Sequence, residues 1–148
     1  MEDTGFQTRA RVSGKRFEVQ GAEFLESLGF RLLGSKVVEQ IGCEIDEVAV
    51  APNGDRVYFE FKGSYNRSKG KPGPGMERTD TAKKGLLTGF LLQAMADRVP
   101  YFILTSHLPV KGRSLAMCEQ SIACGAVAGV LLIDAEETKE FLRDRFGV

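Results

Sequence analysis

The apolar positions in the first part of the chain follow a helical period. Over residues 13–28 they recur four, seven, eight and eleven positions after Phe17, which is the spacing of one face of an α-helix. Gly29 predicts the end of this helix, because glycine favours the left-handed conformation found after a helix C-terminus. Residues 1–13 are polar and irregular, which predicts a frayed tail.

Short apolar or alternating segments after this helix predict strands. They cover residues 30–33, with 36–41 as a continuation or a second strand, and then residues 44–51 and 56–63. Between the last two, Pro52-Asn53-Gly54-Asp55 predicts a hairpin turn, because Asn-Gly favours the positive backbone angles of tight hairpin turns.

Two helices are predicted in the middle of the chain from the residues at their ends. Thr79 or Asp80 is a candidate N-cap for a helix over residues 79–97, because a short polar side chain can accept a hydrogen bond from the first turn. Ser114 can start a second helix in the same way, and Gly125 would close it.

Two apolar runs and a last helix complete the pattern. Residues 101–105 and 127–133 are typical of buried strands, and Asp134 with Glu137 has the spacing of a capping box for a helix to about Phe146. The order α-β-β-β-α-β-α-β-α predicts an α/β fold with a central mixed sheet flanked by helices. The length of 148 residues suits a single domain over residues 1–148.

The composition excludes a disulfide framework, a cysteine zinc site and a membrane-spanning helix. The chain has 20 basic and 20 acidic residues, and its three cysteines follow neither a disulfide nor a zinc-site spacing. No apolar run approaches the roughly 20 residues of a membrane span, and the N-terminus does not resemble a signal peptide. We therefore expect a cytoplasmic protein without membrane contact.

The charges are distributed unevenly. Residues 61–84 contain seven basic and two acidic side chains, and they include a predicted flexible basic loop over residues 64–78. Residues 31–60 contain six acids and three basic side chains. An acidic cluster beside a basic flexible segment suits a site that holds a cation and an anion together, although two solvated surface patches would have the same composition.

The strand that contains Glu60 and Lys62 is the strongest candidate for chemistry. Both side chains share one face of the predicted strand, and core-facing apolar residues share the other. Asp46, on the preceding arm of the hairpin, can be a cross-strand neighbour of Glu60. Two adjacent carboxylates repel each other unless a cation lies between them, and an oxygen-rich site of this kind suits Mg²⁺ or Mn²⁺.

The spacing of these motifs is that of a known family. Gly-Cys-Glu-Ile-Asp46, then about a dozen residues with a turn, then Phe-Glu60-Phe-Lys62 closely resembles the PD-(D/E)XK nuclease superfamily. Phe17-Glu18, followed by Gly29-Phe30, looks like the opening of archaeal Holliday-junction resolvases and related small bacterial nuclease-like proteins. The resemblance covers about residues 14–95. It implies a restriction-endonuclease-like αβββαβ core, with a C-terminal α-β-α extension.

Two positions depart from the family pattern. Ile45 stands where the family motif has a proline, at a position that varies widely in the superfamily. Gln93 lies in the helix that carries the Gln-x-x-x-Tyr motif of the exonuclease branch, but Tyr101 follows eight residues later instead of four. An exonuclease of that branch is therefore disfavoured.

The resemblance implies catalytic roles for four side chains. Asp46 and Glu60 would bind Mg²⁺ or Mn²⁺, together with the backbone carbonyl of Phe61. Glu18 would bind a second ion or a metal-bound water, although its place beside the apolar stripe also suits a solvent-facing glutamate. Lys62 would orient or help deprotonate the attacking water and neutralise charge on the phosphate.

The resemblance further implies DNA as the partner and no organic cofactor. Contacts of basic side chains with phosphates set affinity and position rather than sequence specificity. A homodimer is expected because small nucleases of this type use two copies to reach both strands. The expected phosphate contacts are Arg67, Lys69, Lys71, Arg78, Lys83 and Lys84.

The substrate and even the activity stay open at this point. A metal-dependent endonuclease could select junctions or branched DNA, or belong to a defence or restriction system. The alternative is a non-catalytic nucleic-acid-binding or assembly module on the same fold, which the intact acidic set disfavours. His107 is the only histidine, so a His-rich zinc site is excluded.

Overall fold

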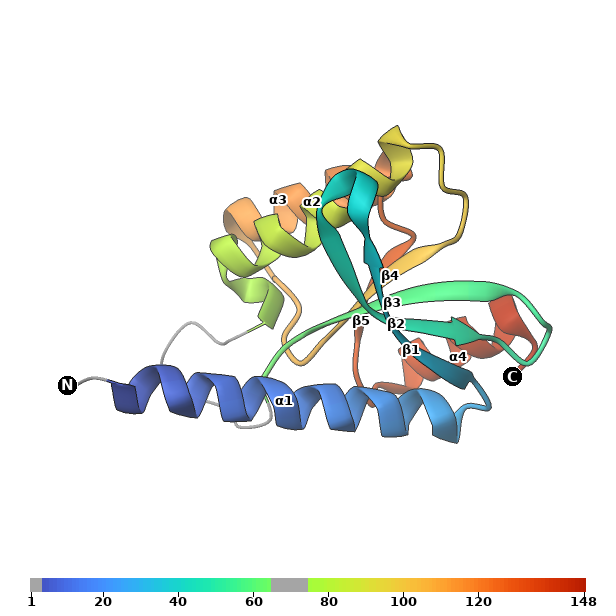
Figure 1. The fold of residues 1–148 in the computed structure, drawn as a ribbon, viewed down its shortest axis with the longest axis horizontal. Coiled ribbons are helices and arrows are strands. Elements are labelled where there is room, and N and C mark those ends of the chain that lie inside the picture. Colours follow the sequence, from blue (N-terminus) through green and yellow to red (C-terminus); the bar gives the residue numbers. More distant parts are fainter. Residues whose placement is uncertain (1–3, 65–74) are drawn as a thin grey trace.

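A five-stranded mixed sheet forms the centre of the computed structural model, which describes residues 4–64 and 75–148 and, for residues 4–13, only the backbone. The first three strands form an antiparallel meander, and the last two add in parallel beside the third (Figure 1). The strands, in spatial order, are β1 (Arg31–Val38), β2 (Cys43–Val50), β3 (Arg56–Lys62), β4 (Tyr101–Thr105) and β5 (Gly129–Leu132).

Two helices pack on each face of the sheet (Figure 1). The first and last helices share one face, and the second and third share the other. The predicted element order and the α/β class with a mixed sheet are confirmed. No helix in the described part of the chain is long and apolar enough to cross a membrane. The helices are α1 (Thr4–Ser27), α2 (Thr79–Ala94), α3 (Gly112–Ala123) and α4 (Glu136–Phe146).

Both faces of the central strand β3 are buried. Val57 and Phe59 are fully buried in the core beneath α1 and α4, whereas Tyr58 is buried in the core beneath α2 and α3. The Phe59 ring stacks on Phe102 with ring centroids 5.8 Å apart. A shift of one residue in the pairing of β3 would turn Glu60 into this aromatic core, so burial determines which face carries the charged side chains.

The predicted tail over residues 1–13 is wrong from residue 4 onward, because α1 begins at Thr4. This segment has no apolar stripe, but it contains no proline and includes Gln, Ala and Arg, which favour helices. An existing helix extends through such residues at low cost. The strand after α1 is continuous over Arg31–Val38, and Glu39–Ile41 forms a 3₁₀ turn instead of more strand.

The side-chain caps predicted for α2, α3 and α4 do not form, because each helix starts at a residue without a capping side-chain hydrogen bond. The Ser114 hydroxyl donates instead to the carbonyl of Glu77 at 3.2 Å. The Asp134 carboxylate accepts from the Gln20 amide at 3.0 Å. Contacts with distant elements therefore replace the local caps.

Gly89 lies where α2 approaches the chain before β5 too closely for a side chain. A Cβ there would lie 2.6 Å from the Ala126 carbonyl oxygen and 2.8 Å from the Val127 side chain. Gly89→Ala is therefore expected to lower the free energy of unfolding by about 1–3 kcal/mol, despite the higher helix propensity of alanine. A Cβ at Gly14 in α1 would have no neighbouring heavy atom of the described residues within 4 Å, so Gly14→Ala is expected to raise the free energy of unfolding by up to about 1 kcal/mol. Urea unfolding measures both changes in the free energy of unfolding. Equal changes for Gly89→Ala and Gly14→Ala would contradict the close approach of α2 to Ala126.

Candidate active site

The hairpin of β2 and β3 brings the two predicted carboxylates together. The Asp46 N–H donates to Glu60 Oε1 at 3.3 Å. The Phe61 N–H donates to Asp46 Oδ2 at 2.9 Å. These two bonds connect the start of β2 with the end of β3, and they hold both carboxyl groups on the same side of the sheet. The predicted cross-strand neighbourhood of Asp46 and Glu60 is confirmed.

Lys62 lies on the same face of β3 and completes the predicted motif. Its Nζ is 3.4 Å from Glu60 Oε2, and the side chains are 24% and 8% exposed. The aliphatic part of Lys62 lies against α2 at Gly85, where a Cβ would be 3.6 Å from Lys62 Cγ and 3.1 Å from Ile103 Cδ1. The ammonium group is thus accessible to a ligand, whereas the Glu60 carboxylate is largely removed from water.

Helix α1 places Glu18 close to this hairpin. A Cβ at Gly21 would lie 2.7 Å from the Phe61 ring, so the absence of a side chain lets the helix approach the sheet. Phe17 faces the sheet from the same side of α1 and is fully buried. Burial raises the pKa of Glu18, and the carboxylate of Asp46 raises it further. Glu18 is therefore within electrostatic range of Asp46 and of Lys62.

The surroundings of these carboxylates disfavour negative charge. Burial raises the pKa of Glu60 to about 7, with a further contribution from Asp46 and an opposing one from Lys62. Burial also raises the pKa of Asp46, whereas the hydrogen bond from the Phe61 N–H lowers it. Lys62 lies among the carboxyl groups of Asp46, Glu60 and Glu18, while Lys15 and Glu44 also act on Glu18. A bound cation would offset the excess negative charge.

The donor set fits a hard divalent cation. Carboxylate oxygens are the preferred protein ligands of Mg²⁺ and Mn²⁺, and Asp46 and Glu60 supply two adjacent carboxyl groups. Among the described residues, no three Asp, Glu, His or Cys side chains already form a metal-ligand group. Glu60 contacts the Lys62 ammonium instead, so binding of a cation would compete with this ion pair.

The predicted basic loop lies largely outside the described residues. Arg67, Lys69 and Lys71 belong to residues 65–74, which the structure does not describe. The end of the predicted loop, Gly75–Glu77, forms a 3₁₀ turn that leads into α2. The phosphate contacts expected from this loop therefore stay predictions.

The basic residues at the start of α2 differ in position. Arg78 and Lys84 are exposed near the N-terminus of α2, and Gly85 of this helix lies against Lys62. Lys83 is exposed too, but it lines an apolar groove of about 440 Å³ with Leu87 on the outer side of α2 and α3. The structure therefore places Lys83 on a different side of α2 from Gly85, which faces the site.

Tyr101 holds α2 against the sheet beside the site, and the sequence pattern gave it no such role. Its hydroxyl donates to the Gly85 carbonyl at 2.8 Å. Burial raises the pKa of Tyr101 well above its usual range, and the carboxylate of Glu60 contributes. All five residues of β4 are buried, so in the sequence only the hydroxyl of Tyr101 indicated a polar contact at this position.

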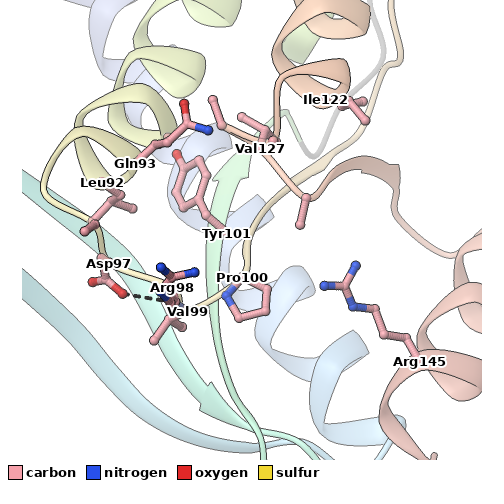
Figure 2. A pocket seen from close by; sticks show the side chains of 15 residues that line it. Leu92, Gln93, Asp97, Arg98, Val99, Pro100, Tyr101, Ile122, Val127 and Arg145 are labelled. Atoms are coloured by element: carbon pink, nitrogen blue, oxygen red, sulfur yellow. Dashed lines mark hydrogen bonds between the residues drawn. The ribbon is translucent and has the colours of Figure 1, made fainter.

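A separate cavity of about 580 Å³ lies at the other end of β4 (Figure 2). Arg98 and Arg145 lie at its edge, as Figure 2 shows. The Asp97 carboxylate in its wall accepts from the Val99 N–H and from the Tyr58 hydroxyl, each at 3.0 Å. This acid therefore serves the fold, and the hairpin carboxylates lie at the opposite end of the sheet.

Comparisons of the chain with protein-family models, with curated proteins and with solved structures give no match.

Proposed function

We propose that the protein is a metal-dependent DNA endonuclease of the PD-(D/E)XK type, with a restriction-endonuclease-like core. One observation carries the proposal: Asp46, Glu60 and Lys62 converge on one face of the β2–β3 hairpin. Glu18 of α1 adds a third carboxyl group within electrostatic range. Glu60 is buried and Asp46 is half-buried, and acids with raised pKa values beside a lysine support a functional site. Carboxylates with a neighbouring cationic group suit binding of a metal ion and a phosphate.

The carboxyl groups would hold the metal. Asp46 and Glu60 are the two central ligands, and Glu18 and the Phe61 carbonyl are the further candidates. When bound, a Mg²⁺ or Mn²⁺ ion lowers the pKa of a water molecule and offsets charge on the phosphodiester. The Phe61 N–H keeps the Asp46 carboxylate oriented through the 2.9 Å hydrogen bond.

Lys62 would supply positive charge to the phosphate. Its ammonium group is partly exposed and lies 3.4 Å from Glu60, so it can contact a phosphate oxygen or the attacking water. An ammonium group is a compact charge with three hydrogen-bond donors, and it stabilises the charge that develops on the phosphate. The aliphatic part of this side chain lies against Gly85 of α2.

A cleavage panel with Lys62→Ala tests the proposal. Supercoiled plasmid, linear duplex, single strand and four-way junction are each incubated with Mg²⁺ or Mn²⁺. We expect metal-dependent cutting of at least one substrate, which Lys62→Ala slows by at least about 100-fold. The control is Lys139→Ala, which removes another ion-paired lysine, 3.3 Å from Glu136 on α4, and should leave the rate unchanged.

Two results would contradict the proposal. One is the absence of cutting by folded protein with metal present, which would favour the non-catalytic nucleic-acid-binding module. The other is cutting that Lys62→Ala leaves unchanged. The homodimer belongs to the same proposal, and light scattering of the active species should give twice the chain mass of 16.2 kDa.

A further inference from the structure

A second polar cavity lies beside the candidate active site, at the carboxyl ends of the parallel strands β3, β4 and β5. Its volume is about 140 Å³. The cavity lining includes Gln20, Ser106, His107, Leu132, Ile133 and Asp134.

Helix α1 contributes to both sites. Phe17 and Gly21 face the sheet, and at about 100° per residue Glu18 and Gln20 lie on opposite flanks of that line. Glu18 is on the flank of the hairpin carboxylates. The Gln20 amide donates to Asp134 Oδ2 at 3.0 Å on the other flank. The cavity and the candidate active site therefore adjoin the same segment of α1.

Hydrogen bonds order the polar groups of this cavity. Ser106 Oγ lies 2.7 Å from His107 Nδ1 and accepts the Ser64 N–H at 3.0 Å. Ser64 follows Lys62 by only two residues, so these groups adjoin the end of β3. Within the described residues, these bonds use one ring nitrogen of His107 and one oxygen of Asp134. A ligand would engage the second nitrogen and the second oxygen.

The backbone of Asp134 adopts the left-handed conformation. Its φ angle is 64°, in a region that aspartate and asparagine enter more readily than most other side chains. Its side chain does not cap α4, although the sequence spacing with Glu137 favours a cap. The Asp134 carboxylate instead accepts the Gln20 amide and lines the cavity.

The chemistry of the lining selects the kind of ligand. The Asp134 carboxylate repels a phosphate group but accepts hydrogen bonds from an amino group. Leu132 and Ile133 add apolar surface suited to a flat ring. The volume is below the roughly 300–1,000 Å³ of pockets that hold whole small molecules, so it suits a fragment about the size of one pyrimidine.

We propose that this cavity binds one unpaired nucleobase that carries an exocyclic amino group, with cytosine as the best fit. The amino group of cytosine would donate to Asp134, and His107 and Gln20 would contact the remaining ring edge. The biological role of this cavity rests on the proposed nuclease function. It implies a substrate with an unpaired base next to the cut, such as a branch or junction, because a paired base must first leave the helix at an energetic cost.

Proton NMR of His107 tests the cavity independently of any nuclease activity. His107 is the only histidine, so its ring protons are a specific probe of this site. Deoxycytidine and thymidine are titrated separately up to their solubility limits. We expect saturable shifts with deoxycytidine at an affinity at least about 5-fold higher than with thymidine, which lacks the amino group. Asp134→Asn should remove this preference.

Matched variants make the titration decisive. Asparagine tolerates the left-handed conformation and keeps an oxygen for the Gln20 amide, so Asp134→Asn should fold normally. Glu137→Gln removes an exposed acid of the first turn of α4 and should keep the preference for deoxycytidine. The inference is overturned if neither nucleoside shifts the His107 signals, or if the preference survives in Asp134→Asn.

Cleavage assays separate this inference from the proposed function. Branched substrates with cytosine or thymine as the unpaired base are compared, with the wild type and Asp134→Asn. A cytosine preference that Asp134→Asn removes supports both. Cutting that is indifferent to the unpaired base overturns the role of the cavity in substrate choice and leaves the nuclease intact. Deoxycytidine binding without cutting of any DNA supports the cavity and contradicts the nuclease.

Discussion

Replacing Asp46 by asparagine is expected to lower the rate of metal-dependent DNA cleavage about 1,000-fold, which corresponds to about 4 kcal/mol of transition-state stabilisation. Asparagine keeps the size of the side chain and an oxygen that can accept the Phe61 N–H. It removes the negative charge of Asp46, one of the two carboxylate charges between which a divalent cation would bind. Initial cleavage rates and a metal titration followed by thermal unfolding measure both consequences.

The matched control for this change is Asp144→Asn, which removes an exposed aspartate on α4. It should leave both cleavage and stabilisation by Mg²⁺ unchanged. If Asp46→Asn keeps metal-dependent cleavage within a few-fold of the wild type, Asp46 is not a metal ligand, and the proposed arrangement of the site is wrong.

The second large effect is expected for Glu60→Gln in metal-free protein. The pKa of Glu60 is raised from 4.5 to about 7, so between these pH values the folded protein holds a proton that the unfolded chain has released. The stability contributed by this proton is complete below pH 4.5 and is lost as the pH rises to about 7. The loss amounts to about 3 kcal/mol, because one pKa unit is worth about 1.4 kcal/mol.

Glutamine cannot ionise, so Glu60→Gln should flatten this pH dependence and make the metal-free protein more stable than the wild type at pH 8. Urea unfolding in EDTA across pH 4.5 to 8 measures the difference. Addition of Mg²⁺ at pH 8 should stabilise the wild type more than Glu60→Gln, because the cation replaces the proton as the partner of the carboxylate. A less stable Glu60→Gln protein at pH 8 in EDTA would show that the ion pair with Lys62 outweighs the cost of burial.

Local patterns were sufficient for the element order and for the centre of the candidate site. The alternation of β3 separates the buried Phe59 from Glu60 because a strand has only two faces. The Asn-Gly turn joins β2 to β3, and it closes with the Ala51 N–H donating to the backbone carbonyl of Asp55 at 2.8 Å. Since both signals act over a few residues, the sequence could predict that Asp46 and Glu60 are neighbours.

Contacts between distant segments decided the remaining features. The sequence could not show that α1 extends back to Thr4, that Gly85 lies against Lys62, or that Tyr101 bonds to α2. A helix cap is a local interaction that contributes about 1 kcal/mol, so a contact that forms when distant elements pack together can replace it.

For this protein, the sequence alone determined the α/β element order, the two faces of β3 and the pairing of the hairpin carboxylates, because periodicity and turn chemistry are local. Only the tertiary structure decided which flank of α1 meets each site, that Asp134 turns to Gln20 instead of capping α4, and how deeply Glu60 is buried. Those properties depend on how closely helices approach the sheet, and this distance results from the packing of the whole core.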